Sequence, residues 1–214
     1  MAPPGGGDAA VMRVEGGEVR GTMAQFEALA AGEGREAVRE IPGLVEALAA
    51  IEAPLVRLQL NTATRTTSRM TFGWCGPDAI ALLIQLGPEW QLLPVPLDQL
   101  PILLARLTGL HPVTPAGREP VVGADPFDRL LSDDEAARVA AFDAYDAALA
   151  FTLGLASADD EWRLAGLTGP SGSWLLDGVD GGDEWRLVPV RASTVYRRLT
   201  AILPGLLAPA LSAS

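Results

Sequence analysis

The side chains that could act as a nucleophile or a general base are few in this sequence. It contains one cysteine, Cys75, and one histidine, His111. Cys75 precedes Gly76 at the predicted end of a strand, and no sequence neighbour would lower the pKa of its thiol. His111 lies in a proline-rich segment, where a histidine is usually a solvated loop residue. A Cys75–His111 pair stays open, because catalytic partners meet in space rather than in sequence.

Two acidic segments have the composition of a hard-metal site. One contains Asp125, Asp128, Asp133, Asp134 and Glu135, and the other runs over residues 177–183. Neither has the spacing of a calcium-binding loop. Ser132 followed by Glu135 has the form of a helix capping box, and Asp and Gly in residues 177–183 are typical of a turn. We therefore predict neither a metal site nor a cofactor.

The sequence motifs that usually accompany catalysis are missing. A phosphate-binding loop needs a lysine, and the sequence has none. No Gly-x-Gly-x-x-Gly opens a helix, and no Gly-x-Ser-x-Gly elbow occurs. We predict a binding protein rather than an enzyme, with no catalytic residues.

Composition excludes several classes of partner. The net charge is −11 and no basic stripe is present, whereas nucleic-acid affinity comes mainly from basic patches. A single cysteine cannot form an internal disulfide and suits a reducing compartment. The first residues have neither the basic nor the apolar region of a signal peptide. The longest uncharged run, residues 199–214, is 16 residues long and too short to cross a bilayer. We expect a cytoplasmic protein without membrane insertion.

A repeated stretch indicates how the chain is organised. Residues 89–95 read Glu-Trp-Gln-Leu-Leu-Pro-Val, and residues 184–190, 95 positions later, read Glu-Trp-Arg-Leu-Val-Pro-Val. An apolar helical pattern follows each copy. A period this long is too large for a solenoid and suggests one unit used twice within a fold.

The periodicity around these copies predicts an α+β protein. Helices are expected over residues 22–30, 44–51 and 97–110, after 132, and over 194–207; strands are expected over 55–61, 67–74, 79–86, 90–95, 148–155, 161–167, 173–177 and 185–190. The prediction is a central, mostly antiparallel sheet with flanking helices, in two pseudo-twofold-related halves of pattern α-ββββ-α. Residues 1–15 are expected to be a disordered tail. Residues 16–214 are expected to form one domain of two repeats, about 20–111 and 127–207, joined by a linker over 112–126.

The end of the chain is the predicted partner-binding segment. It is apolar yet too short to span a membrane, so it either packs on its own domain or offers an apolar face to another protein's helix. Tryptophan is enriched at binding hot spots, and Trp174 lies on a predicted strand of the second half. The predicted partner-binding residues are Leu199, Ile202, Leu203, Leu206, Leu207 and Trp174.

The doubled pattern resembles that of the EspG family, whose members are cytosolic chaperones of type VII (ESX) secretion in actinobacteria. The resemblance is carried by residues 90–95 with 104–112 and by residues 185–190 with 199–204, and it covers roughly residues 20–207. It implies one domain with a central sheet and two helical subdomains. It also implies a non-enzymatic role, in which the protein keeps the apolar helical tip of a PPE protein, within a PE–PPE heterodimer, soluble until export.

Two other functions remain open from the residues alone. One is a small-molecule-binding or enzymatic α+β protein with its site between the two halves. The other is a scaffold that forms a homodimer across exposed sheet edges.

Overall fold

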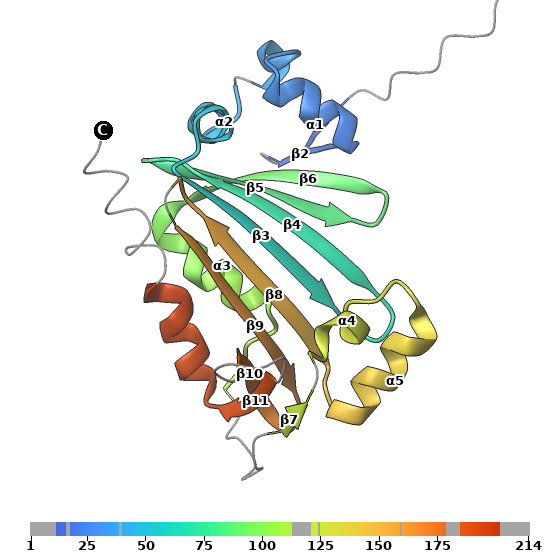
Figure 1. Cartoon of the computed structure of the whole chain (residues 1–214). Helices are drawn as coiled ribbons and strands as arrows, with labels where there is room; N and C mark the ends of the chain where they lie inside the picture. The colour runs from blue at the N-terminus through green and yellow to red at the C-terminus, as the bar shows by residue number, and fades with distance from the viewer. Residues whose placement is uncertain are drawn as a thin grey trace, which may run out of the picture.

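The computed structural model describes residues 12–15, 18–38, 40–112, 121–123, 125–158, 160–178 and 185–201. Within these residues, eleven strands form one antiparallel sheet, and helices pack on both of its faces (Figure 1). The predicted α+β class with a central antiparallel sheet is therefore confirmed.

The N-terminal part of the chain builds one side of the sheet. Its helical segments are α1 (Met23–Ala30), η1 (Arg35–Val38), α2 (Leu44–Glu52), η2 (Leu97–Gln99) and α3 (Leu100–Leu107). Its strands are β1 (Arg13–Glu15), β2 (Glu18–Gly21), β3 (Val56–Ala63), β4 (Ser68–Cys75), β5 (Ala79–Leu86) and β6 (Glu89–Pro96). The four strands predicted over residues 55–95 are all present as β3 to β6, because each has one or two apolar faces to bury.

The C-terminal part builds the other side. Its strands are β7 (Val121–Gly123), β8 (Leu149–Ala156), β9 (Glu161–Gly169), β10 (Gly172–Gly178) and β11 (Trp185–Val190). Its helices are α4 (Phe127–Leu130), α5 (Glu135–Tyr145) and a helix that covers residues 192–201 of the described chain.

The strand order joins the two sides into one sheet. It runs β1-β2-β6-β5-β4-β3-β8-β9-β10-β11-β7, so β3 and β8 meet at the centre. Their antiparallel register places Leu58 opposite Leu155 and Leu60 opposite Leu153. Outward from this central pair, the strands follow chain order on both sides. They are β3, β4, β5 and β6 on one side and β8, β9, β10 and β11 on the other. A duplicated unit would give this order, but the duplication itself stays a prediction.

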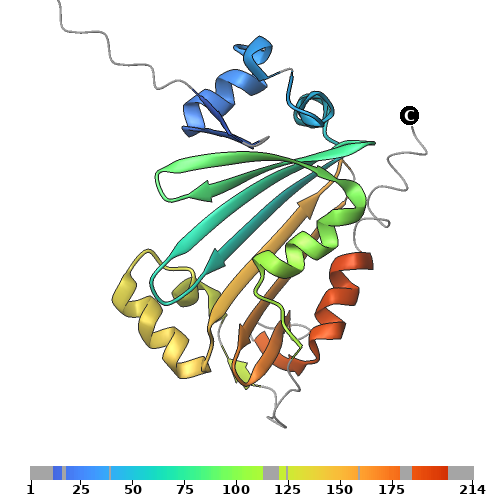
Figure 2. The ribbon, with the colours of Figure 1, turned by 180° about the vertical axis from the view of Figure 1, so that it is seen from behind.

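One face of the sheet is covered along its middle. Alternate residues of β3, including Val56, Leu58 and Leu60, point to this face and are buried. Leu104 of α3 and Leu199 of the C-terminal helix belong to the same core cluster. The two helices lie side by side in front of the sheet in Figure 2, which shows the molecule from behind. Leu199, Leu104 and their neighbours therefore form the main core of the protein.

The opposite face is covered only toward its two sides. Phe26 of α1 and Leu44 of α2 pack against Leu83 of β5. Phe142 of α5 packs in a separate cluster with Leu167 of β9. In Figure 1 these two helical groups lie at the top and at the lower right, and β3 and β8 run between them. The middle of this face is therefore left open.

Four details differ from the sequence-based expectations. Residues 13–15 of the predicted tail form β1, which pairs with β2. Residues 121–123 of the predicted linker form β7, which pairs with β11. The predicted helix over 97–110 begins as a 3-10 turn and ends at Leu107. The cap of α5 is Asp134, whose carboxylate accepts hydrogen bonds from the N–H groups of Ala136 and Ala137; Ser132 instead accepts one from Asp134 N.

In the described part of the chain, no helix is both long enough and apolar enough to cross a membrane.

Candidate functional site

The open middle of the sheet contains two adjoining grooves. The larger has a volume of about 530 Å³ and runs over β3, β8 and β9 toward α4. The second, of about 420 Å³, runs over β3, β4 and β8. Both are lined by Gln59, Gly154 and Glu161. The three shared residues make the two grooves one continuous concave surface, which we call the open face.

The open face exists because its central strands have little apolar surface to bury on that side. Arg57 and Gln59 of β3 are exposed, whereas Val56 and Leu58, on the other face, are buried. Gly154 of β8, directly opposite Gln59, has no side chain. A Cβ built on Gly154 would meet no atom closer than the Gln59 carbonyl oxygen at 4.0 Å. At Gly154 the floor of the open face is therefore backbone without a side chain, which allows a ligand or another chain to approach closely there.

Aromatic side chains form one wall of the open face. Phe72 and Trp74 of β4 line the smaller groove. Phe72 stacks on Trp90 of β6, with ring centroids 5.8 Å apart and an interplanar angle of 21°. Phe72 and Trp74 have centroids 6.4 Å apart. At the far end of the larger groove, Trp185 is 37% exposed. Half-exposed aromatic rings offer apolar area with little rotamer entropy to lose, which suits binding.

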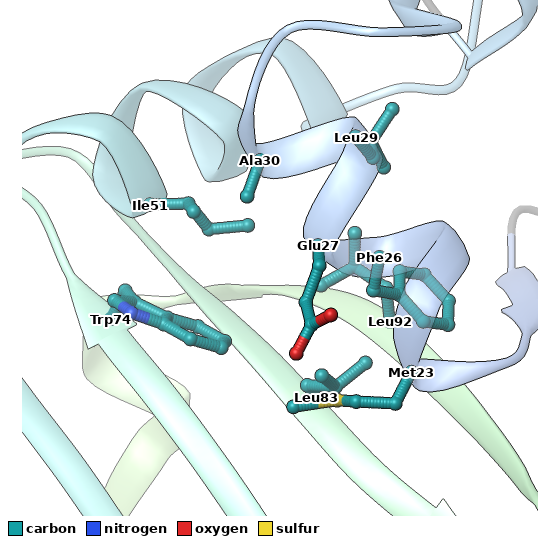
Figure 3. A pocket seen from close by; sticks show the side chains of 9 residues that line it. All are labelled: Met23, Phe26, Glu27, Leu29, Ala30, Ile51, Trp74, Leu83 and Leu92. Atoms are coloured by element: carbon teal, nitrogen blue, oxygen red, sulfur yellow. The ribbon is translucent and has the colours of Figure 1, made fainter.

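A small apolar pocket continues from this wall beneath α1 (Figure 3). It has a volume of about 70 Å³ and lies between α1, α2 and the sheet. Its lining residues are Met23, Phe26, Glu27, Leu29, Ala30, Ile51, Trp74, Leu83 and Leu92. Trp74 lines both the pocket and the smaller groove. In Figure 3 the carboxylate of Glu27 reaches from α1 toward Trp74 and Leu83. The pocket is the size of a single apolar side chain, with one acidic group beside it.

The predicted partner-binding residues divide into two groups. Leu199 and Trp174 are buried, at 0% and 8% exposure, in two different core clusters. The remaining residues, Ile202, Leu203, Leu206 and Leu207, lie outside the described residues. Leu199 and Trp174 therefore pack within the fold and present little surface in this structure.

The residues considered for catalysis are not brought together. Cys75 is fully buried in the main core, and this burial raises the pKa of its thiol to about 12. His111 is exposed after α3, with Nδ1 2.9 Å from the Gly109 carbonyl oxygen. No hydrogen bond joins Cys75 and His111 in the described structure. A buried thiol with a raised pKa is a poor nucleophile, because the thiolate is the reactive form.

Each acidic segment has a carboxylate that makes a structural contact, Asp125 in one and Asp177 in the other. Asp125 accepts a hydrogen bond from the N–H of Phe127 at 2.8 Å and lines the larger groove. Asp177 pairs with Arg198 at 3.6 Å, and residues 179–183 lie outside the described chain. Across the described ranges, no three or more His, Cys, Asp or Glu side chains are grouped closely enough to hold one metal ion.

Comparison with known proteins finds likeness in the fold but not in the sequence. No family model matches the chain, and no curated protein matches it. Among solved structures, the chain is similar to the Mycobacterium tuberculosis type VII secretion system chaperone EspG5, solved in complex with the PE25–PPE41 dimer. The TM-score is 0.55 at 11% sequence identity, over 87% of this chain and 96% of the EspG5 chain. The chain has an EspG-like fold.

Sequence reasoning missed the open face, although its signals were present. The polar members of β3, Arg57, Gln59 and Asn61, alternate with buried residues and so mark a face without an apolar cover. Gly154 lies inside a mostly apolar strand, and a glycine there is a known sign of close backbone approach. Both signals depend on knowing that β3 and β8 are neighbours.

Proposed function

We propose that this chain is a protein-binding, chaperone-like module that holds the apolar helical part of a partner protein. The observation that supports this function is the shared fold with EspG5, a chaperone whose solved complex contains a protein dimer. The likeness extends over 87% of this chain and 96% of the EspG5 chain.

The open face is the surface we propose for this partner. Its bare floor at Gly154 and its aromatic wall at Phe72 and Trp74 suit an amphipathic helix that lies across β3 and β8. The pocket beneath α1 would accept one apolar side chain of that helix. Glu27 at the pocket would favour a basic residue on the helix, one turn from the anchoring side chain.

The C-terminal segment is the second part of the proposed surface. Four apolar residues come soon after the helix over residues 192–201 in the sequence: Ile202, Leu203, Leu206 and Leu207. Leu199 fixes the start of this segment in the main core. We propose that the apolar residues after Leu199 add to partner binding.

We further propose that the partner is a PE/PPE-type secretion substrate and that the chain acts in the cytoplasm of an actinobacterium with a type VII system. The resemblance of residues 90–95 and 185–190 to the EspG family and the partner seen with EspG5 support this choice.

Co-expression with a candidate PE–PPE heterodimer, followed by size-exclusion chromatography and calorimetry, tests the proposal. Gly154→Gln places a side chain on the floor of the open face and should weaken binding at least tenfold. Ser68→Gln is the matched control, because Ser68 is exposed on β4 and lines neither groove. Leu203→Asp should weaken binding without lowering the melting temperature. Equal binding by the wild type and Gly154→Gln would refute the open face as the partner site.

One observation favours a second function, the binding of a small molecule between the two predicted halves. The larger groove crosses from β3 to β8 and β9, the junction of the two predicted halves, and polar groups of Asn61, Glu161 and Arg163 line it. A small polar molecule bound there would support the ligand-binding alternative. Native mass spectrometry of the purified protein would reveal such a ligand as an added mass that disappears on denaturation.

A further inference from the structure

A polar pocket lies on the sheet face opposite to the open face. It has a volume of about 270 Å³ and is bounded by the β3–β4 hairpin, the end of β5 and the last turn of α3. Its lining residues are Leu60, Thr62, Ala63, Thr64, Thr67, Arg69, Thr71, Ile84, Arg106, Leu107 and Leu149. Leu60 and Ile84 belong to the main core, which places the pocket at one end of the covered face.

Two arginines give this pocket an unbalanced positive charge. Arg69 of β4 and Arg106 of α3 are both exposed, and no Asp or Glu is among the described residues that line the pocket. Neither guanidinium forms an ion pair or hydrogen bond within the described chain. In the same described residues, six other arginines form ion pairs with carboxylates. In a protein of net charge −11, an anion would relieve the repulsion between Arg69 and Arg106.

The remaining polar groups around the pocket leave donors for a ligand. Thr64 and Thr67 bond to each other through their hydroxyls at 2.8 Å and close the hairpin turn. Thr62 lies directly across from Arg69 in the β3–β4 register, and its hydroxyl has no hydrogen bond within the described residues. Thr71, two residues after Arg69 on the same face, is only 3% exposed. A hydroxyl beside a guanidinium is a common arrangement for binding carboxylate oxygens.

Three of the carbonyl groups at the end of α3, those of Leu104, Ala105 and Arg106, accept hydrogen bonds from within the chain. Leu104 O accepts hydrogen bonds from the backbone N–H and the hydroxyl of Thr108, the latter at 2.8 Å. Arg106 O accepts the N–H of Gly109 at 3.1 Å. This capping reduces the repulsion that the end of the helix would exert on an anion beside the two guanidinium groups.

Contacts from α5 fix the position of the β3–β4 hairpin, which carries Arg69. Arg65 at its tip pairs with Asp143 of α5 at 2.7 Å. The guanidinium of Arg138, a buried residue of α5, donates from Nε to the Arg65 carbonyl oxygen at 3.3 Å. A hairpin fixed in this way loses less entropy when a ligand binds.

We propose that this pocket binds a small carboxylate with a short, branched apolar body. The carboxylate lies between Arg69 and Arg106 with Thr62 as a further donor, and the apolar body contacts Leu107 and Leu149. This site goes beyond the proposed partner-binding function, since it lies on the other face of the sheet and needs no partner protein.

NMR titration of the full chain at low ionic strength tests the site with three probes. Isovalerate has both the carboxylate and the branched body, isovaleramide keeps the shape without the charge, and acetate keeps the charge without the body. Isovalerate should shift the amide signals of β4 and the end of α3 and bind at least about tenfold more tightly than isovaleramide, because charge-assisted hydrogen bonds are lost in the amide. Acetate should bind more weakly than isovalerate.

Single substitutions test which residues bind the carboxylate of isovalerate. Arg69→Gln and Arg106→Gln should each weaken isovalerate binding by about tenfold, the loss expected for one charged hydrogen-bond partner. Arg129→Gln removes an exposed arginine of α4 that lines neither this pocket nor the open face, and it should leave binding unchanged. Equal affinities for isovalerate and isovaleramide, or for the wild type and Arg69→Gln, would overturn the proposal.

Discussion

Two glycines on neighbouring strands should respond in opposite directions to the same substitution. Gly154 of β8 lies on the open face, and a Cβ there would meet only the Gln59 carbonyl oxygen, at 4.0 Å. Gly166 of β9 pairs with Phe151, and a Cβ there would lie 2.7 Å from Phe151 Cζ and 2.7 Å from the Trp174 carbonyl oxygen. Neither glycine has a positive φ, so backbone strain does not separate them.

These contacts determine the size of each effect. Gly154→Ala removes freedom from the unfolded chain without a clash and should raise the free energy of unfolding by about 0.4–1 kcal/mol. Gly166→Ala pushes a methyl group into a ring and a strand carbonyl, and the carbonyl cannot move without breaking the sheet. Overpacking of this kind should lower the free energy of unfolding by about 1–3 kcal/mol.

Thermal and urea unfolding followed by circular dichroism measure both variants. For a domain of this size, 1 kcal/mol changes the melting temperature by about 2–4 °C. Gly154→Ala should therefore melt slightly above the wild type and Gly166→Ala several degrees below it. If both variants lose stability equally, the assignment of Gly154 to an uncovered face is wrong, and the proposed partner site loses its structural basis.

Two further predictions concern single side chains. The Cys75 thiol should resist a disulfide reagent in the folded protein and react with it in urea. Its pKa rises from 9.0 in the unfolded chain to about 12 in the fold, so the free energy of unfolding should fall as pH rises between these values. Cys75→Ala should remove this pH dependence. Rapid labelling of the native protein at pH 8 would contradict the burial. Asp134→Ala should lower the free energy of unfolding by about 1 kcal/mol, and more than Ser132→Ala does, because Asp134 caps α5; a larger effect of Ser132→Ala in urea unfolding would contradict this.

The elements themselves were largely predictable from local patterns. Buried and exposed residues alternate along β3, and Ile80 to Ile84 of β5 are buried in succession, as the unbroken apolar run predicts. Pro94 and Pro96 have no N–H to donate to a strand ladder, so the sequence predicts that this end of β6 lies at an edge or leaves the sheet. On its outer side β6 pairs with β2 only over Trp90 to Leu92, so its proline end pairs with β5 alone within the described chain.

Short elements and caps were harder to predict, because several residues satisfy the same local rule. Ser132 and Asp134 are both good capping residues, and only the angle at which the chain enters α5 selects Asp134. The three residues of β7 have no periodicity of their own. They become a strand because β11 offers unpaired hydrogen-bonding groups beside them.

The local pattern of side chains is enough to place the helices and strands, since the periods of 3.6 and 2 depend only on which side chains must leave water. The pairing of β3 with β8 arises only in the folded protein, because backbone hydrogen bonds between distant strands carry no sequence signature. That single pairing sets Gln59 beside Gly154 and creates the open face. The packing of α3 near the β3–β4 hairpin likewise brings Arg69 and Arg106 to one pocket, although Arg106 comes 37 positions after Arg69 in the chain.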